Sequence, residues 1–305
     1  MKLTFPIPNM VQLKAMSLRP WELKVTGAEQ TRLAKWADDV GYDMLSTGEH
    51  FVIPKDHVEL SGPKYAHAAA MQGYLAGATT RIKVNSSIAL VALQHPAVTA
   101  KALATIDDIS SGRVITTFGA GWLKPEFDAL GVPFHERGAR MDEYVAAIIE
   151  LWTKEYATFE GKFVSFKDVT CAPKPFQKPH IPVWFGGDAD AALKRVAKWG
   201  SGWWPFLTKH QDLAARIDFI KSQPAWKSGP LDVFFGLSAS LIGEGHKVQG
   251  ERKDMSDQEI IDRLGALKRL GVTYTSVPIP AACPSLEAFV DYARHVIEDI
   301  RPKLQ

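Results

Sequence analysis

Short β-type runs and longer helical runs alternate along almost the whole chain, and this alternation restricts the possible folds more than any other feature. Apolar residues recur every three to four positions in the longer runs, as in amphipathic helices. We expect eight strands, at Leu3–Asn9, Asp43–Thr47, Ile82–Val91, Val114–Phe118, Ile181–Phe185, Trp203–Phe206, Leu231–Ile242 and Val272–Val277. We expect the helices at Thr26–Val40, Lys64–Thr80, His95–Ile109, Arg137–Lys154, Asp188–Trp199, His210–Lys221, Ser256–Leu270 and Ser285–Ile300.

Eight strand–helix units predict a parallel sheet, and their number favours a single-domain (β/α)8 TIM barrel over residues 1–305. An open, doubly wound sheet of the Rossmann or flavodoxin type is the alternative, because the pattern does not reveal strand order. The usual dinucleotide fingerprint is incomplete, since Gly119 and Gly121 are followed by Lys124 where a third glycine is expected. Residues 155–180 depart from the alternation, and their prolines and alternating aromatic residues predict an inserted hairpin.

Composition excludes several classes of protein. The 305 residues are 46% hydrophobic and 23% charged, which are ordinary globular proportions, and the formal charge of +2 gives no reason to expect a nucleic-acid partner. Cys171 and Cys283 are too far apart for a disulfide scaffold or a cysteine-based zinc site. We find no apolar run long enough to cross a bilayer and no signal-peptide pattern after Met1, so we expect a cytoplasmic protein without a membrane partner.

The ends of the expected strands indicate what kind of ligand the barrel holds, because barrel enzymes place their active sites there. These positions carry one Glu, one His and one Asp, with many glycines and tryptophans. They are Pro8-Asn9, Gly48-Glu49-His50, Ser86-Ser87-Ile88, Gly119–Trp122, Gly186-Gly187-Asp188, Trp203-Trp204, Ser238 and Pro278-Ile279. Hydrolase, P-loop and zinc-protease motifs are absent from the sequence. Such a lining fits a large planar ligand that brings its own chemistry, and it predicts no metal site.

Two of these positions have both a chemical and a structural interpretation. His50 could transfer protons near neutral pH, or it could simply satisfy a turn at the strand end. Gly186 and Gly187 lead from a strand into a helix, whose first N–H groups could hold a phosphate. The alternative is a tight turn in which Asp188 caps the helix.

An ordered series of motifs runs from Val40 to Phe206. It comprises Gly41-Tyr42-Asp43, Gly48-Glu49-His50, Pro54, His95-Pro96, Lys101–Asp107, Ser110–Arg113, Gly119–Trp122, Glu126-Phe127, Gly131–Phe134, Arg137–Glu143, Leu151-Trp152, Pro173-Lys174-Pro175 and Trp184–Gly187. This series resembles the bacterial luciferase-like flavin monooxygenases and their deazaflavin-dependent relatives. The resemblance implies a (β/α)8 barrel, usually a homodimer, with a flavin-type ring at the carboxyl ends of the strands.

The resemblance also implies roles for particular residues. His50 stands where deazaflavin-dependent members have a histidine facing the reactive ring, so we expect it to donate or accept a proton. Ser87-Ile88 stands where the family has a non-prolyl cis peptide behind the ring, and Gly186-Gly187 matches a phosphate-side loop. We expect further cofactor contacts from Glu49, Gly121 and Trp122. Because Trp122 replaces the catalytic Glu of the sugar-phosphate-oxidising members, the substrate is expected to be more apolar.

The resemblance covers members that use different cofactors, so it leaves the identity of the cofactor open. The Gly-Trp and Arg-Gly-x-Arg arrangement most resembles members that use coenzyme F-420, an 8-hydroxy-5-deazaflavin, which implies hydride transfer to or from a small apolar or carbonyl-bearing substrate. Lys209, His210 and Lys247 are candidates for contacts with its acidic tail. One alternative is an FMN-dependent two-component monooxygenase, which would need a flavin reductase as partner. The other is a non-catalytic flavin-binding paralogue.

Overall fold

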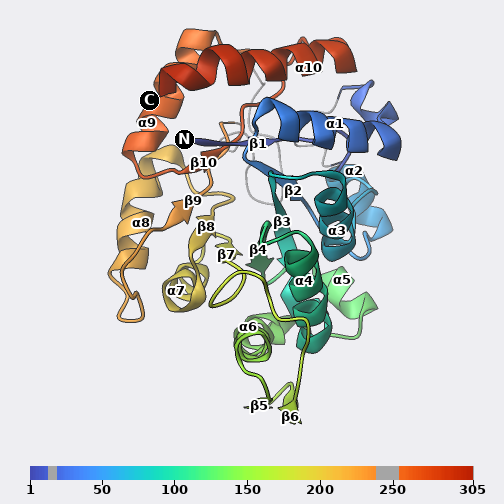
Figure 1. Cartoon of the computed structure of the whole chain (residues 1–305), viewed down its shortest axis with the longest axis vertical. Helices are drawn as coiled ribbons and strands as arrows, with labels where there is room; N and C mark the ends of the chain where they lie inside the picture. The colour runs from blue at the N-terminus through green and yellow to red at the C-terminus, as the bar shows by residue number, and fades with distance from the viewer. Residues whose placement is uncertain (13–18, 238–253, 305) are drawn as a thin grey trace.

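Eight parallel strands form one sheet that closes on itself, as a computed structural model of residues 1–12, 19–237 and 254–304 shows (Figure 1). The strands are β1 (Lys2–Phe5), β2 (Met44–Thr47), β3 (Lys83–Leu90), β4 (Val114–Gly119), β7 (Val183–Gly186), β8 (Gly202–Trp204), β9 (Asp232–Val233) and β10 (Tyr274–Thr275). They are hydrogen-bonded in chain order, and β10 pairs with β1. A parallel bridge between Phe234 and Tyr274 joins β9 to β10 and closes the ring. The predicted barrel is confirmed, and the open doubly wound sheet is excluded.

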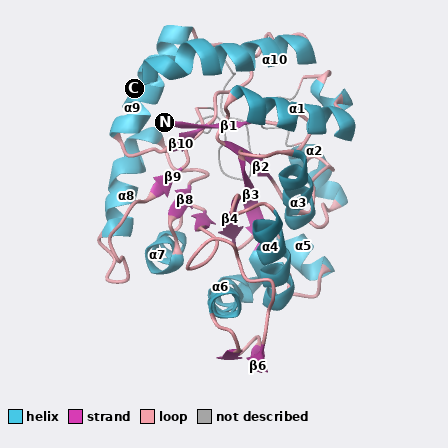
Figure 2. Cartoon of the chain, in the orientation of Figure 1, coloured by secondary structure: helices cyan, strands magenta, loops and turns pink. Residues whose placement is uncertain are grey.

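Helices follow the strands and cover the outside of the barrel (Figure 2). They are α1 (Gly27–Val40), α3 (Ala68–Ala78), α4 (Pro96–Ile109), α6 (Arg137–Thr153), α7 (Asp190–Trp199), α8 (Leu213–Lys221), α9 (Asp257–Arg269) and α10 (Leu286–His295). A π-helical segment, Val296–Ile300, and a 3-10 turn, Arg301–Leu304, continue α10. Other 3-10 turns lie at Glu22–Lys24, Lys55–His57, Val91–Leu93, Phe134–Glu136 and His210–Asp212. Each expected helix is therefore present, with small shifts at its ends.

Two short helices were not expected from the sequence. They are α2 (Val58–Ser61), after β2, and α5 (Lys124–Ala129), after β4. Neither is long enough to show the helical repeat of apolar residues by which the longer helices are recognised. Both lie in loops at the carboxyl ends of strands, where they shape the candidate site.

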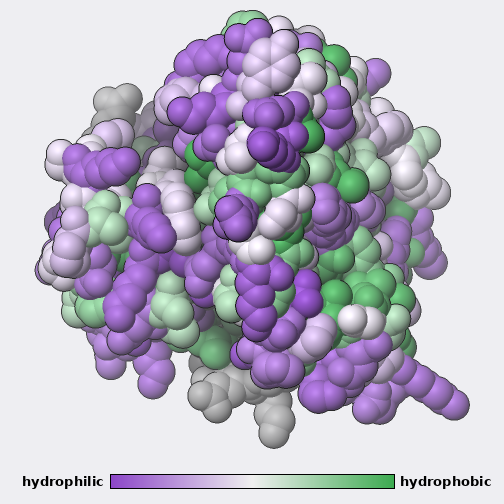
Figure 3. All heavy atoms as spheres, turned by 90° about the horizontal axis from the view of Figure 1, so that it is seen from below, coloured by the Kyte–Doolittle hydropathy of each residue, from purple (hydrophilic) through white to green (hydrophobic). Residues whose placement is uncertain are grey.

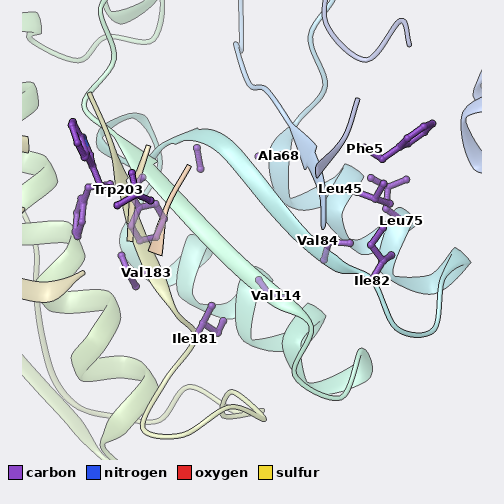
Figure 4. Packing of buried hydrophobic residues seen from close by; sticks show 14 of the residues in the cluster. Phe5, Leu45, Ala68, Leu75, Ile82, Val84, Val114, Ile181, Val183 and Trp203 are labelled. Atoms are coloured by element: carbon purple, nitrogen blue, oxygen red, sulfur yellow. The ribbon is translucent and has the colours of Figure 1, made fainter. Parts of the chain in front are cut away.

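The barrel interior is filled with side chains toward the amino-terminal ends of the strands. Strand residues alternate in direction, and one set, including Leu45, Val84 and Val114, packs in the main core with residues of the covering helices (Figure 4). Five other residues pack on one another, four in strands β2, β4, β7 and β10 and one directly after β9, which only the barrel interior permits: Met44, Ile115, Trp184, Tyr274 and Phe234. A large ligand must therefore enter from the carboxyl ends of the strands.

The excursion at residues 155–180 contains the predicted hairpin, with β5 (Ala157–Glu160) paired antiparallel to β6 (Ser165–Val169). The Glu143 carboxylate of α6 accepts hydrogen bonds from the backbone N–H groups of Lys162, Phe163 and Val164, which holds the hairpin turn on that helix. Figure 3 looks at the end of the molecule that carries this hairpin, and its surface is mostly hydrophilic with scattered apolar patches. The hairpin is thus an addition to the barrel on the side away from α1 and α10 (Figure 1).

Two expectations reach beyond the described residues. The strand expected at Leu231–Ile242 is much shorter, since β9 spans Asp232–Val233 and is followed by the bridge at Phe234. Residues from 238 on, with Ser238 and Lys247, lie outside the described part. Within the described ranges, no helix is long and apolar enough to cross a membrane.

Candidate active site at the carboxyl ends of the strands

His50 follows β2 and is held by a carboxylate from the loop after β4. Its Nδ1 lies 2.7 Å from Oε2 of Glu126, and only 9% of its side chain is exposed. The imidazole meets the ring of Tyr65 edge-on at 4.6 Å between centroids, and the ring of Trp122 at 6.1 Å. Because these contacts come from three directions, the imidazole has one defined orientation.

Glu126 lies on α5 and is completely buried. Its second oxygen, Oε1, accepts the backbone N–H of Phe51 at 2.6 Å and that of Val52 at 3.4 Å. An ionised carboxylate can only accept hydrogen bonds, and with Glu126 in that form Nδ1 of His50 is the donor in this contact. Nε2 of His50 has no hydrogen-bond partner among the described residues. That atom is therefore available to exchange a proton with a ligand.

The sequence alone gives Glu126 no role beyond its place in the Glu126-Phe127 motif. Lys124-Pro125-Glu126 does carry a local signal, since proline and an acidic residue are favoured in the first turn of a helix. What local sequence cannot reveal is that α5 packs over the end of β2, 76 residues earlier in the chain.

Glu49 directs its carboxylate to backbone groups. One oxygen accepts the N–H of Ala68 at 2.8 Å, and the other accepts the N–H of Leu90 at 2.9 Å. Burial raises the pKa of this carboxyl, and the nearby Glu126 acts in the same direction. These bonds tie the end of β2 to the start of α3 and the end of β3. A contact between Glu49 and a cofactor stays a prediction.

The peptide bond between Ser87 and Ile88 is cis, as expected, and it lies in a bulge where the pairing of β3 with β4 shifts register. Beyond the bulge, Ile88 packs against two glycines of neighbouring strands. A Cβ at Gly119 would lie 2.9 Å from Cδ1 of Ile88, and a Cβ at Gly186 would lie 2.8 Å from it. β3, β4 and β7 therefore present a smooth apolar surface where these three residues meet.

Gly121 and Trp122 lie on the loop that leads from β4 to α5. Gly121 has a φ of +82°, and a Cβ there would lie 2.7 Å from the ring of Phe127, so the close packing requires glycine. This turn brings Trp122 beside His50, with 39% of its side chain exposed. The tryptophan therefore lies beside the histidine with part of its surface exposed.

Gly187 and Asp188 both contact the end of β8 and the loop that follows it. The N–H of Gly187 donates to the carbonyl of Trp204 at 3.1 Å, so a phosphate here would have to be bound by the first turn of α7. Asp188 does not cap α7, which was one of the two interpretations: the residue before the helix is Ala189. The Asp188 carboxylate instead accepts the N–H groups of Phe206, Leu207 and Thr208, which lie in the loop after β8.

The predicted site residues thus form two groups that meet at one end of the barrel. His50 and Trp122 lie together with Glu126, while Ile88 lies with Gly186 on the bulge side. A Cβ at Gly48 would lie 3.7 Å from the carbonyl oxygen of Ser87, so the end of β2 borders the bulge. In the described part of the chain, no group of three or more His, Cys, Asp or Glu side chains could hold a metal ion.

Known proteins similar to this chain include enzymes of both cofactor types. It is 30% identical over 235 residues to the FMNH2-dependent dimethylsulfone monooxygenase of Pseudomonas putida, which covers 74% of this chain and 61% of that protein. Monooxygenase RslO1 from Streptomyces bottropensis superposes with a TM-score of 0.80 over all of both chains, at 20% identity. The coenzyme F-420-dependent tetrahydromethanopterin reductase of Methanopyrus kandleri superposes with a TM-score of 0.70 at 19% identity, over 92% of this chain and 96% of the reductase.

The two structural likenesses show a shared fold, and the sequence carries the family assignment. The sequence pattern that defines the luciferase-like monooxygenases matches residues 7–242, which include every strand from β2 to β9 and both groups of site residues. This chain therefore belongs to the luciferase-like monooxygenase family of oxidoreductases.

Proposed function

We propose that this protein is an oxidoreductase that moves a hydride between a bound deazaflavin, coenzyme F-420, and a small apolar or carbonyl-bearing substrate. The observation that carries the proposal is the 2.7 Å contact between His50 Nδ1 and Glu126, with Nε2 left available for a ligand. A hydride transfer between a carbonyl and an alcohol requires a proton transfer at the oxygen. A buried histidine held by a carboxylate is suited to that task.

The residues at the strand ends fit a planar ring. Ile88 lies against Gly119 and Gly186, so no side chain projects from those two glycines over the bulge. Ring systems of this kind bind on apolar surfaces with a few placed polar groups. We assign Ile88 and the neighbouring glycines to one face of the ring, and Trp122 with His50 to the substrate side. A deazaflavin, when bound, supplies hydride chemistry without activating oxygen.

His50 and Glu126 have defined tasks in this proposal. When a carbonyl is reduced, Nε2 of His50 donates a proton to its oxygen, and in the opposite direction Nε2 accepts the proton of the alcohol. Glu126 keeps its hydrogen bond to Nδ1 throughout and stabilises the positive charge on the imidazole. Trp122 and Tyr65 border the imidazole with aromatic surface, which favours an apolar substrate.

A second candidate is supported by the sequence comparison. The Pseudomonas putida relative at 30% identity is named as an FMNH2-dependent monooxygenase. By that analogy this chain would use reduced FMN and oxygen, and a flavin reductase would be its partner. The match covers 61% of that relative, so its substrate is not carried over to this chain.

We also propose a homodimer, as the family resemblance implies. The outer face of α3 has no charged residue from Ala68 to Ala78, and Tyr74 on this helix is 53% exposed. On the adjoining α4, Val98 is 60% exposed. Light scattering during gel filtration measures the mass directly, and a mass of one chain would contradict the proposal.

Titration of the purified protein with oxidised F-420 and, separately, with FMN tests the proposed function. Quenching of fluorescence gives both dissociation constants. Tighter binding of F-420, followed by substrate-dependent reduction of the bound cofactor by alcohols, supports hydride transfer. Preference for FMN, with oxygen consumption on addition of a flavin reductase, supports the second candidate. Binding of neither cofactor would contradict both.

A further inference from the structure

We propose that Glu126 is a positioning residue that fixes the tautomer of His50, so that Nδ1 keeps its proton and Nε2 is the atom that exchanges protons. The catalytic meaning of this tautomer rests on the proposed function. The tautomer itself is a property of the protein alone, so its test and the cofactor titrations can fail independently.

The two oxygens of the Glu126 carboxylate have different hydrogen-bond partners. Oε1 accepts the backbone N–H of Phe51 at 2.6 Å, and Oε2 lies 2.7 Å from Nδ1 of His50. A backbone N–H can only donate, and an ionised carboxylate can only accept. With Glu126 ionised, Nδ1 is therefore the donor in the second contact, which leaves Nε2 of a neutral imidazole without a proton. Complete burial of Glu126 strengthens these bonds, because no water competes for them.

The helix that carries Glu126 is fixed by packing. Phe127, its neighbour on α5, is completely buried, lies against Gly121, and meets the ring of Phe134 edge-on at 5.3 Å. The carboxylate thus approaches His50 from a rigid element. A residue that acts through another in this way needs such support, since small displacements would break its hydrogen bond.

Glu49 provides a matched comparison. It is also a buried carboxylate at the end of β2, but its oxygens bind the backbone N–H groups of Ala68 and Leu90. Nδ1 of His67 lies 4.0 Å from Oε1 of Glu49, beyond hydrogen-bond distance. Of these two carboxylates, only Glu126 bonds to an imidazole, so the two differ in the property that the proposal concerns.

Glu126→Gln tests the proposal because an amide has one acceptor and one donor side. Phe51 and Val52 donate to the position of Oε1, so the amide oxygen is expected there and the NH2 group opposite Nδ1. Nδ1 must then accept, and the proton moves to Nε2. In protein labelled with 15N-histidine, NMR distinguishes the two nitrogens, and it is recorded at a pH above which the His50 signals no longer change. We expect protonated Nδ1 at His50 in the wild type and protonated Nε2 in Glu126→Gln.

Glu49→Gln is the control, and the His50 tautomer is expected to stay as in the wild type. Assignment of the His50 signals uses their loss in His50→Ala. If Glu126→Gln keeps the proton on Nδ1, or if Glu49→Gln moves it equally, Glu126 does not set the tautomer. If Glu126→Gln fails to fold, the wild type decides alone: a proton on Nε2 at His50 overturns the proposal. Turnover of folded Glu126→Gln should fall by a factor on the order of 10² to 10⁴, as expected for a catalytic histidine held in the wrong tautomer.

Discussion

The δ1 methyl group of Ile88 occupies the space beside Gly186 that a larger residue would need. A Cβ at Gly186 would lie 2.8 Å from this methyl carbon and 3.0 Å from Cγ2 of the same side chain. Ile88 follows the cis peptide of β3, whereas Gly186 ends β7, so the contact spans the end of β4 between them. One isoleucine side chain of β3 therefore contacts the ends of both β4 and β7 under the proposed ring site.

Gly186→Ala is expected to destabilise the protein by about 1–3 kcal/mol, the usual cost of overpacking. Ile88→Val removes Cδ1, the atom closest to the new methyl group, and should recover part of that loss in the double variant. Urea unfolding of the wild type, both single variants and the double variant measures the coupling. Strictly additive effects would contradict the contact between the two side chains.

Glu49→Gln should lower the free energy of unfolding by about 1–3 kcal/mol, because one buried backbone N–H then loses its acceptor. The N–H groups at risk belong to Ala68 and Leu90, which the two carboxylate oxygens now bind separately. Hydrogen exchange can identify the affected group, since its amide should exchange faster than in the wild type. Unchanged unfolding and unchanged exchange would show that these bonds do not hold the strand end.

His295 should make stability depend on pH near neutrality. Its Nε2 lies 2.8 Å from Asp257 and its Nδ1 lies 2.7 Å from Asp299, and these hydrogen bonds raise its pKa above the ordinary 6.5. The folded state thus holds the proton more tightly than the unfolded state. The resulting stability is fully present below about pH 6.5 and is lost as the pH rises through the folded-state pKa.

The check on His295 is urea unfolding at several pH values in the wild type and in His295→Asn. The variant should lack the part of the pH dependence that lies above pH 6.5. His295 and its two aspartate partners are partly exposed, so salt should weaken this pH dependence of stability. A variant with the same pH profile as the wild type would remove His295 from this role.

Local sequence was sufficient to predict features that depend on residues only a few positions apart, such as an apolar run or a helix cap. Eight strand positions followed from short apolar runs, and the start of α1 at Thr26 is a capping box with Glu29, three residues on. Local sequence was insufficient where the partner is distant. Asp188 was interpreted as a possible helix cap, yet its carboxylate binds N–H groups 18 to 20 residues later.

The same limit explains why the site was predicted only in part. His50 could be placed at a strand end from the pattern, and the cis peptide at Ser87-Ile88 came from the family resemblance. Glu126 was found only in the structure, because its bond to His50 depends on how the loop after β4 crosses the end of β2. The fold of the barrel brings these two loops together, and no short stretch of the sequence contains both of them.

His50→Ala tests the central claim that His50 transfers the proton at the ring site. With F-420 or FMN, whichever the wild type binds, the dissociation constant should stay nearly unchanged. Substrate turnover should fall by a factor on the order of 10² to 10⁴, the usual contribution of a general acid or base. His135→Ala, at an exposed position outside these contacts, is the control and should behave as the wild type. Turnover of His50→Ala equal to the wild type would contradict the account.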